Sequence, residues 1–288
     1  MIRTNIDKLV KMSVVGEISH PKASPYTITA DGRPVVRPGT GGITYNIRVG
    51  DQIANWVADH VEPCVSIKNS DSGANNGLNT LTCIGNEALV IGGEAKEEKG
   101  TVTGKHGGIE HILVDFSPEI RDKLNIGDKM LIKAIGVGLE LPDFPQVTVM
   151  NVSPELFEAM EIDCEDESLV IPVTHRIPAR IMGSGLGSNH AYRGDYDIQM
   201  FDDATVEEYG LDTLRFGDIV AIIDADTTYG RIYKQGAITI GSISHSNCVS
   251  AGHGPGVTSL FTSTNGKIIP QIDSGANLAK ILNLRDDL

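Results

Sequence analysis

The sequence predicts an α+β protein that is rich in β-strands and has only short helices. Glycine is abundant, with 32 of 288 residues, whereas aromatic residues make up only 5% of the chain. Short segments in which apolar and polar residues alternate are separated by glycine turns along the whole chain. This pattern favours strands joined by tight turns over a helix bundle. A repeated unit of strand, short helix and strand is the third observation that supports the prediction.

The repeated unit occurs three times, once as a partial copy. Each copy begins with an alternating strand and continues through Ser or Asp into a short acidic helix. Ser117 and Ser153 are expected to cap two of these helices, because each precedes a proline that suits the first helical position. The two full copies are residues 111–136 and 196–226, and the partial copy is residues 147–173.

A Gly-Asp turn leads into the second strand of both full copies, and another lies near the N-terminus. Glycine accepts a positive φ, and the following carboxylate can accept hydrogen bonds from turn amides. We therefore interpret Asp51, Asp128 and Asp218 as structural residues. The order of strand, short helix, Gly-Asp turn and strand resembles the GD box of the cradle-loop barrels, the group that contains double-psi and RIFT barrels. The resemblance implies GD-box barrel-like units, and the repetition indicates an internal duplication.

The acidic stretch EIDCEDES marks the expected boundary between two domains. The N-terminal β-rich domain would span residues 1–165 and hold two Gly-Asp turns. The C-terminal β-rich domain would span residues 166–288 and carry the candidate site. Two halves that interleave in space are the alternative arrangement.

Charge and composition exclude several classes of function. The formal net charge is −14, which argues against sequence-independent binding to nucleic acid, because that binding needs a basic face. The N-terminus lacks the apolar core of a signal peptide, and no apolar stretch is long enough to span a bilayer. We therefore expect a cytoplasmic protein. A thiolate zinc site is not expected, because no CxxC pair occurs among Cys64, Cys83, Cys164 and Cys248.

The first candidate for a ligand-binding segment is MGSGLGSNHAYRGDYD, residues 182–197. It lacks the last glycine of a Rossmann fingerprint and the lysine of a P-loop. One interpretation is a glycine-rich connection between strands. The other is a run of backbone amides that cradles an oxyanion or a phosphate, with His190 beside it. On the second interpretation the residues that bind substrate or anion are Gly183, Gly185, Gly187, Ser188 and Asn189.

The second candidate segment is IIDADTTYGRIYKQG, residues 222–236. Asp224 and Asp226 alternate at the end of an apolar strand, so both carboxylates are expected to project from one face. Paired carboxylates can bind a divalent cation or divide acid and base roles between them. Arg231 can hold a substrate carboxylate through two hydrogen bonds. The alternative is a solvated strand end followed by a turn.

The third candidate segment is AITIGSISHSNCVSAGHGPG, residues 237–256. A strand delivers His245 at its end, and a glycine-rich turn presents His253. The GxSxG pattern of a nucleophile elbow is absent. Cys248 is a minor candidate for a Cys–His pair and is otherwise a small core residue. The segment around His106 has the same order of His-Gly, glycine and apolar strand, which predicts that His106 and His253 line one cleft or a subunit interface.

The stretch GAITIGSISHSNCVSAGHGPGVTSLFTS, with DADTTYGR before it, resembles the family called domain of unknown function 4438. The likeness extends over nearly the whole chain but assigns no catalytic residue. A fainter likeness links the chain to acetamidase- and formamidase-type amidohydrolases, which are β-rich and rich in glycine, histidine and aspartate. The chain lacks a clear copy of their acidic and histidine motifs. This second likeness therefore serves only to favour hydrolysis of a small polar substrate.

We expect a metal-assisted hydrolase that acts on a small polar substrate of the amide or ester type. The expected cofactor is a divalent metal, and the expected partners are a small-molecule ligand and further copies of the chain in a homo-oligomer. A non-catalytic small-ligand-binding protein or an oligomeric structural protein is the alternative. The expected catalytic residues are His190, His245, His253 and Asp224, and the expected metal ligands are Asp224, Asp226, His245 and His253.

Overall fold

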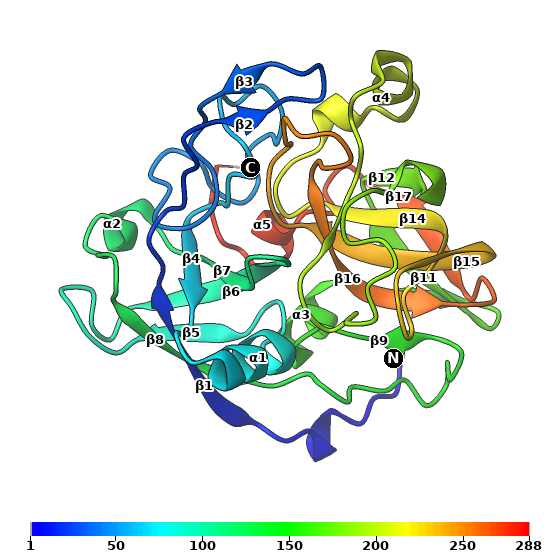
Figure 1. Cartoon of the computed structure of the whole chain (residues 1–288). Helices are drawn as coiled ribbons and strands as arrows, with labels where there is room; N and C mark the ends of the chain where they lie inside the picture. The colour runs from blue at the N-terminus through cyan, green and yellow to red at the C-terminus, as the bar shows by residue number, and fades with distance from the viewer. Residues whose placement is uncertain (1, 288) are drawn as a thin grey trace.

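The computed structural model describes residues 2–287 and confirms the predicted fold class. The chain is rich in β-strands, its helices are short, and one sheet closes into a barrel. Figure 1 shows this barrel in the N-terminal half, in blue to green, beside a second β-sheet formed mainly by the C-terminal half, in yellow and orange. None of the helices in residues 2–287 combines the length and the apolar character needed to cross a membrane.

The barrel closes because β1 pairs with β8 as well as with β4, which leaves its strands without an unpaired edge. The strands follow the order β1-β4-β7-β6-β5-β8, and neighbouring strands are antiparallel. Their bounds are β1 (Met12–Ile18), β4 (Val65–Lys68), β5 (Glu87–Val90), β6 (Lys99–His106), β7 (His111–Asp115) and β8 (Lys129–Ala134).

The second large sheet receives one strand from the N-terminal half. Strands β12, β14, β15, β16 and β13 follow one another in this order, and β9 pairs with β16. Its strands are β9 (Thr148–Val149), β12 (His175–Pro178), β13 (Tyr196–Asp197), β14 (Ile219–Asp226), β15 (Ile232–Ile243) and β16 (Gly256–Ser263). Two smaller sheets contain β10 (Asp163–Glu165), β11 (Ser168–Val173) and β17 (Ile268–Ile272), and β2 (Thr27–Ile28) with β3 (Pro34–Val35).

Two of the helices begin at the serines that the sequence indicates, but only one of these serines caps through its side chain. Ser153 Oγ accepts a hydrogen bond from Leu156 N at 3.0 Å, whereas Ser117 occupies the N-cap position without a side-chain cap bond. The pentapeptide DSGAN occurs twice, at residues 71–75 and 273–277, and each copy lies at the start of a helix. The caps differ, because Asp71 caps the first helix and Asn277 caps the last. The helices are α1 (Ser72–Leu81), α2 (Pro118–Arg121), α3 (Pro154–Ala159), α4 (Asp203–Tyr209) and α5 (Leu278–Ile281), with 3-10 helices at Ile6–Lys8, Ala179–Ile181 and Leu211–Thr213.

The three Gly-Asp turns share one geometry. Gly50, Gly127 and Gly217 have φ angles of 98°, 87° and 81°. In each turn the aspartate carboxylate accepts a hydrogen bond from the backbone amide three residues earlier, at 2.7 Å in the first turn and 2.8 Å in the others. The first and third turns also touch, because Gly50 N donates to Phe216 O and Phe216 N donates to Asp51 O. These turns therefore join the two halves of the chain.

Asp218→Ala is expected to destabilise the protein far more than Asp128→Ala. Asp218 is 1% exposed, and its carboxylate also contacts the Arg215 guanidinium at 3.0 Å and the Asn277 side-chain amide at 2.8 Å. Because its removal takes a buried acceptor from both groups and from the turn amide, we expect a loss of about 3 kcal/mol in the free energy of unfolding. Asp128 is half-buried and caps one turn amide, so its removal should cost about 1 kcal/mol. Urea unfolding of both variants measures the difference, and equal losses would contradict this account.

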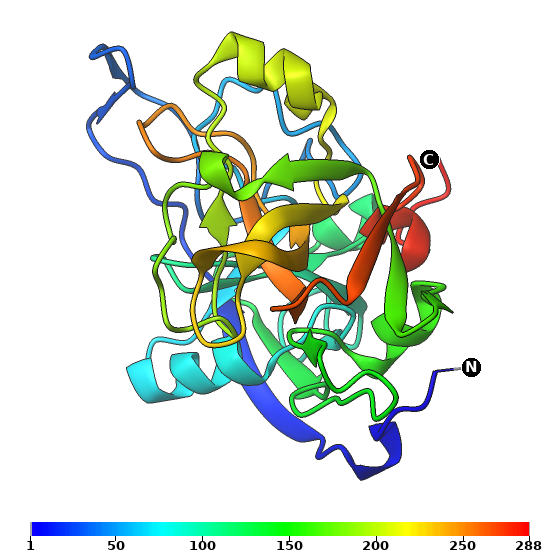
Figure 2. The same ribbon diagram turned by 90° about the vertical axis from the view of Figure 1, so that its right-hand side faces the viewer.

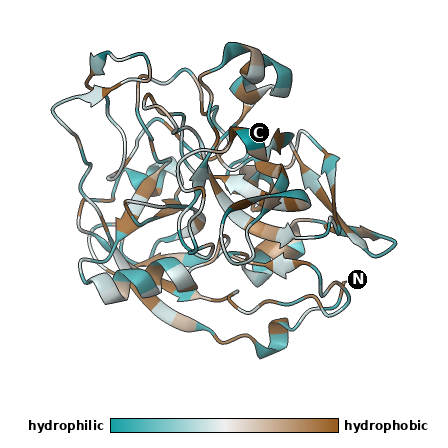
Figure 3. Cartoon of the chain, turned by 45° about the vertical axis from the view of Figure 1, so that its right-hand side comes forward, coloured by the Kyte–Doolittle hydropathy of each residue, from teal (hydrophilic) through white to brown (hydrophobic). Residues whose placement is uncertain are grey.

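Both hydrophobic clusters within residues 2–287 contain side chains from the two halves. The main cluster of buried side chains includes Ile112 from the barrel, Leu260 from β16 and Leu278 from α5. Figure 3 shows hydrophobic colours on the central strands and hydrophilic colours on much of the peripheral helices. Figure 2 shows α1 and α4 at opposite ends of the molecule. Between them, β6 and β16 meet through hydrogen bonds that join Lys105 and Thr258, and the candidate site lies at this junction.

Candidate functional site

A cavity of about 270 Å³ lies between the two halves of the chain. The N-terminal half contributes His60 and His106 to its wall, and the C-terminal half contributes Asp195, Asp197 and His253. His106 and His253, which belong to the two similar His-Gly turns, thus line one cleft, as expected from the sequence. Clefts between domains are a common place for small-molecule sites.

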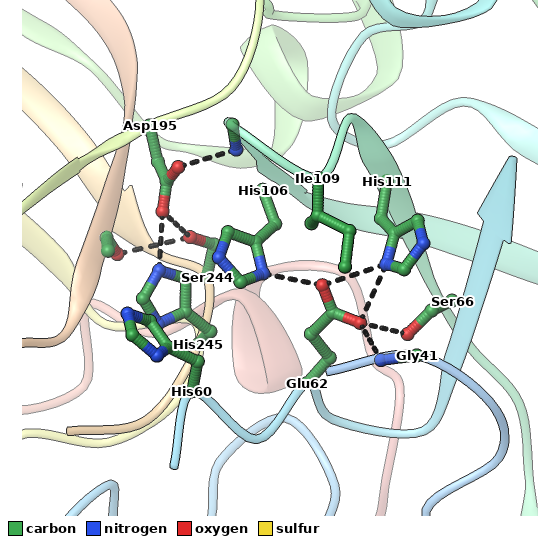
Figure 4. Close-up of polar contacts among 12 residues, drawn as sticks. Gly41, His60, Glu62, Ser66, His106, Ile109, His111, Asp195, Ser244 and His245 are labelled. Carbon is green, nitrogen blue, oxygen red and sulfur yellow. Dashed lines mark hydrogen bonds and ion pairs between the residues drawn. The ribbon is translucent and has the colours of Figure 1, made fainter. Parts of the chain in front are cut away.

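A buried carboxylate, Glu62, anchors two of the histidines, as Figure 4 shows. Its Oε1 accepts a hydrogen bond from His106 Nδ1 at 2.5 Å, and its Oε2 accepts one from His111 Nδ1 at 3.0 Å. Gly41 N and Ser66 Oγ also donate to Oε2. Burial favours a higher pKa, but the imidazoles of His106 and His111 outweigh it and hold the pKa of Glu62 well below its ordinary value. An ionised Glu62 accepts only, so it fixes a proton on His106 Nδ1.

Two imidazoles, those of His106 and His245, are each held at Nδ1 by an oxygen acceptor. His245 Nδ1 lies 3.0 Å from the carbonyl oxygen of Ser246, which can only accept, so this nitrogen carries the proton. In the neutral ring of either histidine the lone pair therefore lies on Nε2. A carboxylate or carbonyl acceptor at the other nitrogen is the usual arrangement for a metal-binding histidine. The centroids of the two rings are 4.1 Å apart.

Asp195 completes a first ligand group with His106 and His245. Its Oδ1 accepts a hydrogen bond from Gly107 N at 2.7 Å, and its Oδ2 lies 2.7 Å from His245 Nε2. The second contact has the distance of an ion pair, but within residues 2–287 the buried His245 Nε2 has no partner with hydrogen-bond geometry. One ligand atom from each residue of the first ligand group lies within 4.8 Å of the other two. Two imidazoles and one carboxylate are the ligands of catalytic zinc and non-haem iron sites.

A second ligand group consists of His60, Cys248 and His253. One ligand atom from each of these residues also lies within 4.8 Å of the other two. His60 Nε2 is 3.2 Å from His253 Nδ1. Asp59 Oδ1 contacts His60 Nδ1 at 3.1 Å and Cys248 Sγ at 2.8 Å. The ring centroids of His60 and His245 are 5.1 Å apart, so the two ligand groups are neighbours.

Asp197 lies between the two ligand groups. Its Oδ2 is 3.1 Å from His253 Nδ1 and 3.8 Å from His60 Nε2, whereas its Oδ1 is 3.7 Å from His245 Nε2. Gly254 N also donates to Oδ2. Each oxygen of this carboxylate therefore faces a different ligand group.

Four carboxylates in the site each form an ion pair with at least one histidine. Burial favours a higher pKa for Asp197 and Asp59, but hydrogen bonds with histidines keep the pKa of Asp197 below its ordinary value and lower that of Asp59 to about 2. Burial disfavours the charged form of His60, but its contacts with the carboxylates of Asp197 and Asp59 raise its pKa to about 12. Buried carboxylates need a positive partner, so the cluster is suited to a cation. The carboxylates are Asp59, Glu62, Asp195 and Asp197.

Arg231 and Glu110 line the same cavity outside the two ligand groups. Arg231 is 3% exposed, and its guanidinium donates to the backbone oxygens of Arg193 at 2.8 Å and Gly185 at 3.4 Å. In the described part of the chain its Nε has no partner, and neither does the buried Oε2 of Glu110. Burial lowers the pKa of Arg231. A ligand in the cavity would therefore meet a buried cation and an unpaired carboxylate.

The glycine-rich segment borders the cavity but offers fewer free amides than the sequence suggests. Gly185 and Ser188 line the cavity, whereas Gly183, Gly187 and Asn189 do not. The amides of Gly183 and Gly187 donate to backbone carbonyl oxygens, so these two amides cannot cradle an anion. From this glycine-rich stretch, Ser184, Gly185 and Ser188 form part of the cavity wall.

The predicted catalytic histidines lie in different parts of the cavity region. His245 belongs to the first ligand group and His253 to the second. His190 also lines the cavity, but it is exposed and belongs to neither group. The structure therefore brings His245 and His253 together and leaves His190 at the solvent side.

Asp224 and Asp226 do not join these histidines. A register shift between Ile223 and Ala225 creates a β-bulge, and Asp224 has a φ of 65°. The bulge interrupts the strand alternation on which the predicted pairing of these two carboxylates depends. Asp224 Oδ1 instead accepts a hydrogen bond from Gly236 N, and Asp226 Oδ1 accepts one from Thr228 N. Neither aspartate lines the cavity.

Sequence reasoning did not select Asp195, Asp197, His60 or Glu62 as ligands. Asp195 and Asp197 stand two residues apart in GDYD, at the start of β13, so strand alternation was a signal that could have found them. His60 and Glu62 lie in irregular chain, and His60 has a φ of 53°. No periodic pattern marks this second pair.

The fold and the site define a β-rich protein of two joined halves, with a cleft of imidazoles and carboxylates between them. Models of the N-terminal and C-terminal parts of "Domain of unknown function (DUF4438)" match residues 26–158 and 159–282. The chain therefore belongs to the DUF4438 family, as its resemblance indicated. It is similar to the crystal structure of TM1086, with a TM-score of 0.93 and 48% sequence identity over 96% of this chain and 98% of that one. A search of curated proteins found no match.

Proposed function

We propose that this protein is a metal-dependent hydrolase of small polar substrates of the amide or ester type. The first ligand group, His106, Asp195 and His245, would hold a divalent metal through two imidazoles and one carboxylate. In catalytic sites of this type a metal with an open position lowers the pKa of bound water to about 7 and makes it a nucleophile.

The single observation that carries the proposal is the state of His245. Its side chain is fully buried, its Nδ1 donates to Ser246 O, and its Nε2 lies 2.7 Å from Asp195 Oδ2 in an ion-pair contact that lacks hydrogen-bond geometry in residues 2–287. A buried polar atom without a partner costs free energy, unless a ligand satisfies it. The neighbouring Asp195 Oδ2 at 2.7 Å provides the negative charge that a cation at this nitrogen requires.

The rest of the cavity supports hydrolysis of a small substrate. Glu110 lines the cavity, and a carboxylate at the cavity wall could act as the general base that takes a proton from the attacking water. Arg231 supplies a buried cation that can bind a carboxylate or stabilise the oxyanion formed during hydrolysis. The cavity volume of about 270 Å³ suits a metabolite-sized ligand rather than a polymer.

The test is metal analysis combined with hydrolysis assays on the full chain. We expect protein purified without chelator to contain metal, and chelated protein reloaded with Zn²⁺ or Mn²⁺ to hydrolyse members of a panel of small amides and esters. His245→Ala should lower metal affinity and hydrolysis by more than the roughly 10–100-fold that outer partners of a metal ligand contribute. Asp224→Asn is the control, because this aspartate lies outside the cavity and asparagine tolerates its positive φ.

Each outcome decides between specific alternatives. A chain that takes up no divalent metal, or a folded His245→Ala variant with unchanged hydrolysis, would overturn the proposal. Metal binding that depends on His245, with no hydrolysis of any member of the panel, would instead favour the non-catalytic ligand-binding alternative.

A further inference from the structure

We propose that the cavity holds a second metal ion, bound by His60, Cys248 and His253, with Asp197 bridging it to the first. The inference rests on the proposed function for the first ion and adds a thiolate site for an ion of the zinc class. Both ions would then lie in one cleft, and hydrolysis would use a two-ion centre.

The second ligand group has the compactness that a metal site needs. One atom from each of His60, Cys248 and His253 lies within 4.8 Å of the other two. Ligand atoms that surround a zinc ion at about 2.0–2.3 Å lie about 3–4 Å from one another, so small side-chain movements would close the site. His60 and His253 face the cavity, and this leaves room for water or substrate at the remaining position.

Cys248 determines which metals suit this group. Soft or borderline ions such as Zn²⁺ accept a thiolate, whereas Mg²⁺ and Ca²⁺ prefer oxygen ligands. Ser250 N donates to Cys248 Sγ at 3.2 Å, and Cys248 Sγ donates to Asp59 Oδ1 at 2.8 Å, so a bound ion would replace the proton of this thiol. A single thiolate with two imidazoles needs no CxxC motif, so the scatter of cysteines along the chain does not exclude this site.

Asp59 contacts two members of the second ligand group without belonging to it. Its Oδ1 contacts both His60 Nδ1 and Cys248 Sγ, so it can orient the imidazole while leaving His60 Nε2 directed toward His253. Carboxylates that bind the far nitrogen of a ligating histidine are a regular outer layer of metal sites. Glu62 has the equivalent place behind His106 in the first ligand group.

Asp197 connects the two ligand groups. Its Oδ1 lies 3.7 Å from His245 Nε2, and its Oδ2 lies 3.1 Å from His253 Nδ1. A carboxylate with one oxygen toward each ligand group can bind both ions. In two-metal sites the ions are about 3.5–4 Å apart, and such a pair would activate the attacking water and polarise the carbonyl group of the substrate.

Titration of the metal-free full chain with Co²⁺ tests the second site directly. We expect two bound ions per chain and a near-ultraviolet charge-transfer absorption band that reports a thiolate–cobalt bond. Cys248→Ser should abolish this band and reduce the bound cobalt to one ion per chain. Cys164→Ser is the matched control, because this exposed cysteine lies outside both ligand groups, and it should keep two ions and the band.

Two further variants keep the test independent of folding and of the first ion. His253→Ala changes a partly exposed residue and should also reduce the bound cobalt to one ion, which covers the case in which Cys248→Ser fails to fold. His245→Ala should lose the first ion but keep the thiolate band. One ion per chain without a thiolate band in the unmodified protein, or a band that persists in Cys248→Ser, would overturn the second site. Failure of the proposed function has a different signature, namely two bound ions without hydrolysis.

Discussion

Replacement of Gly256 by alanine is expected to abolish metal binding at the first ligand group. Gly256 is the first residue of β16, and its Cα faces the junction of Asp195 and His245. A Cβ at this position would lie far inside van der Waals contact with Asp195 Oδ2 and His245 Nε2. These are the two atoms that we expect to bind the ion, so the methyl group would push both ligands out of position.

Movement of Asp195 or His245 away from the added methyl group would break hydrogen bonds. Asp195 is held through its other oxygen by Gly107 N, and His245 is held through Nδ1 by Ser246 O. We therefore expect metal affinity at the first ligand group to fall by more than about 100-fold, beyond the effect of losing an outer partner. Overpacking of this buried position should also cost about 1–3 kcal/mol of stability.

Cobalt titration and urea unfolding of Gly256→Ala measure these two effects. The thiolate–cobalt band should persist, because the three atoms nearest to the added methyl group belong to Asp195 and His245 and not to the second ligand group. Gly77→Ala is the control, since a Cβ at this position would meet no neighbouring side chain within 4 Å and the residue lies in helix α1, where alanine is favourable. A folded Gly256→Ala protein that binds the first ion as tightly as the unmodified chain would refute the assignment of Asp195 and His245 as ligands.

Local pattern made the strands and turns of this fold predictable, but not the partners of the strands. Alternating segments and Gly-Asp turns identify β7, β8, β14 and β16, since a strand's periodicity and a glycine's positive φ are local properties. Closure of the barrel depends on the pairing of β1 with β8, which lie more than a hundred residues apart. No local signal specifies such a pairing.

In the candidate site, too, local sequence pattern predicts some residues, whereas others depend on the three-dimensional fold. His245 and His253 stand at a strand end and in a glycine turn, where polar groups reach a cleft, and both enter the ligand groups. Asp224 lies at a β-bulge and outside the cavity and the ligand groups, and a bulge cannot be recognised from alternation alone. His60 comes from irregular chain in the other half of the protein, so only the three-dimensional fold brings it to His253.

Glu62→Gln is expected to weaken metal binding at the first ligand group by about 10–100-fold. Glu62 accepts from His106 Nδ1 on one oxygen and from Gly41 N and Ser66 Oγ on the other. A glutamine amide accepts on one side only, so its NH₂ must face either the backbone amide of Gly41 or the ring of His106. In the first orientation the glutamine NH₂ faces Gly41 N and Ser66 Oγ, the two groups that donate to Glu62 in the unmodified protein. The second draws the lone pair of His106 to Nδ1 and places the proton on Nε2, the atom that must bind the ion.

Competition titration with a chromophoric chelator measures the affinity of Glu62→Gln for the first ion. Glu110→Gln is the matched control: this carboxylate lines the same cavity, but it contacts neither imidazole of the first ligand group, so metal affinity should be unchanged. Circular dichroism of both variants separates the loss of a ligand's orientation from the loss of the fold. If Glu62→Gln folds and retains full affinity, then the proton on His106 is not set by Glu62, and His106 would have to bind the ion by a different nitrogen or not at all.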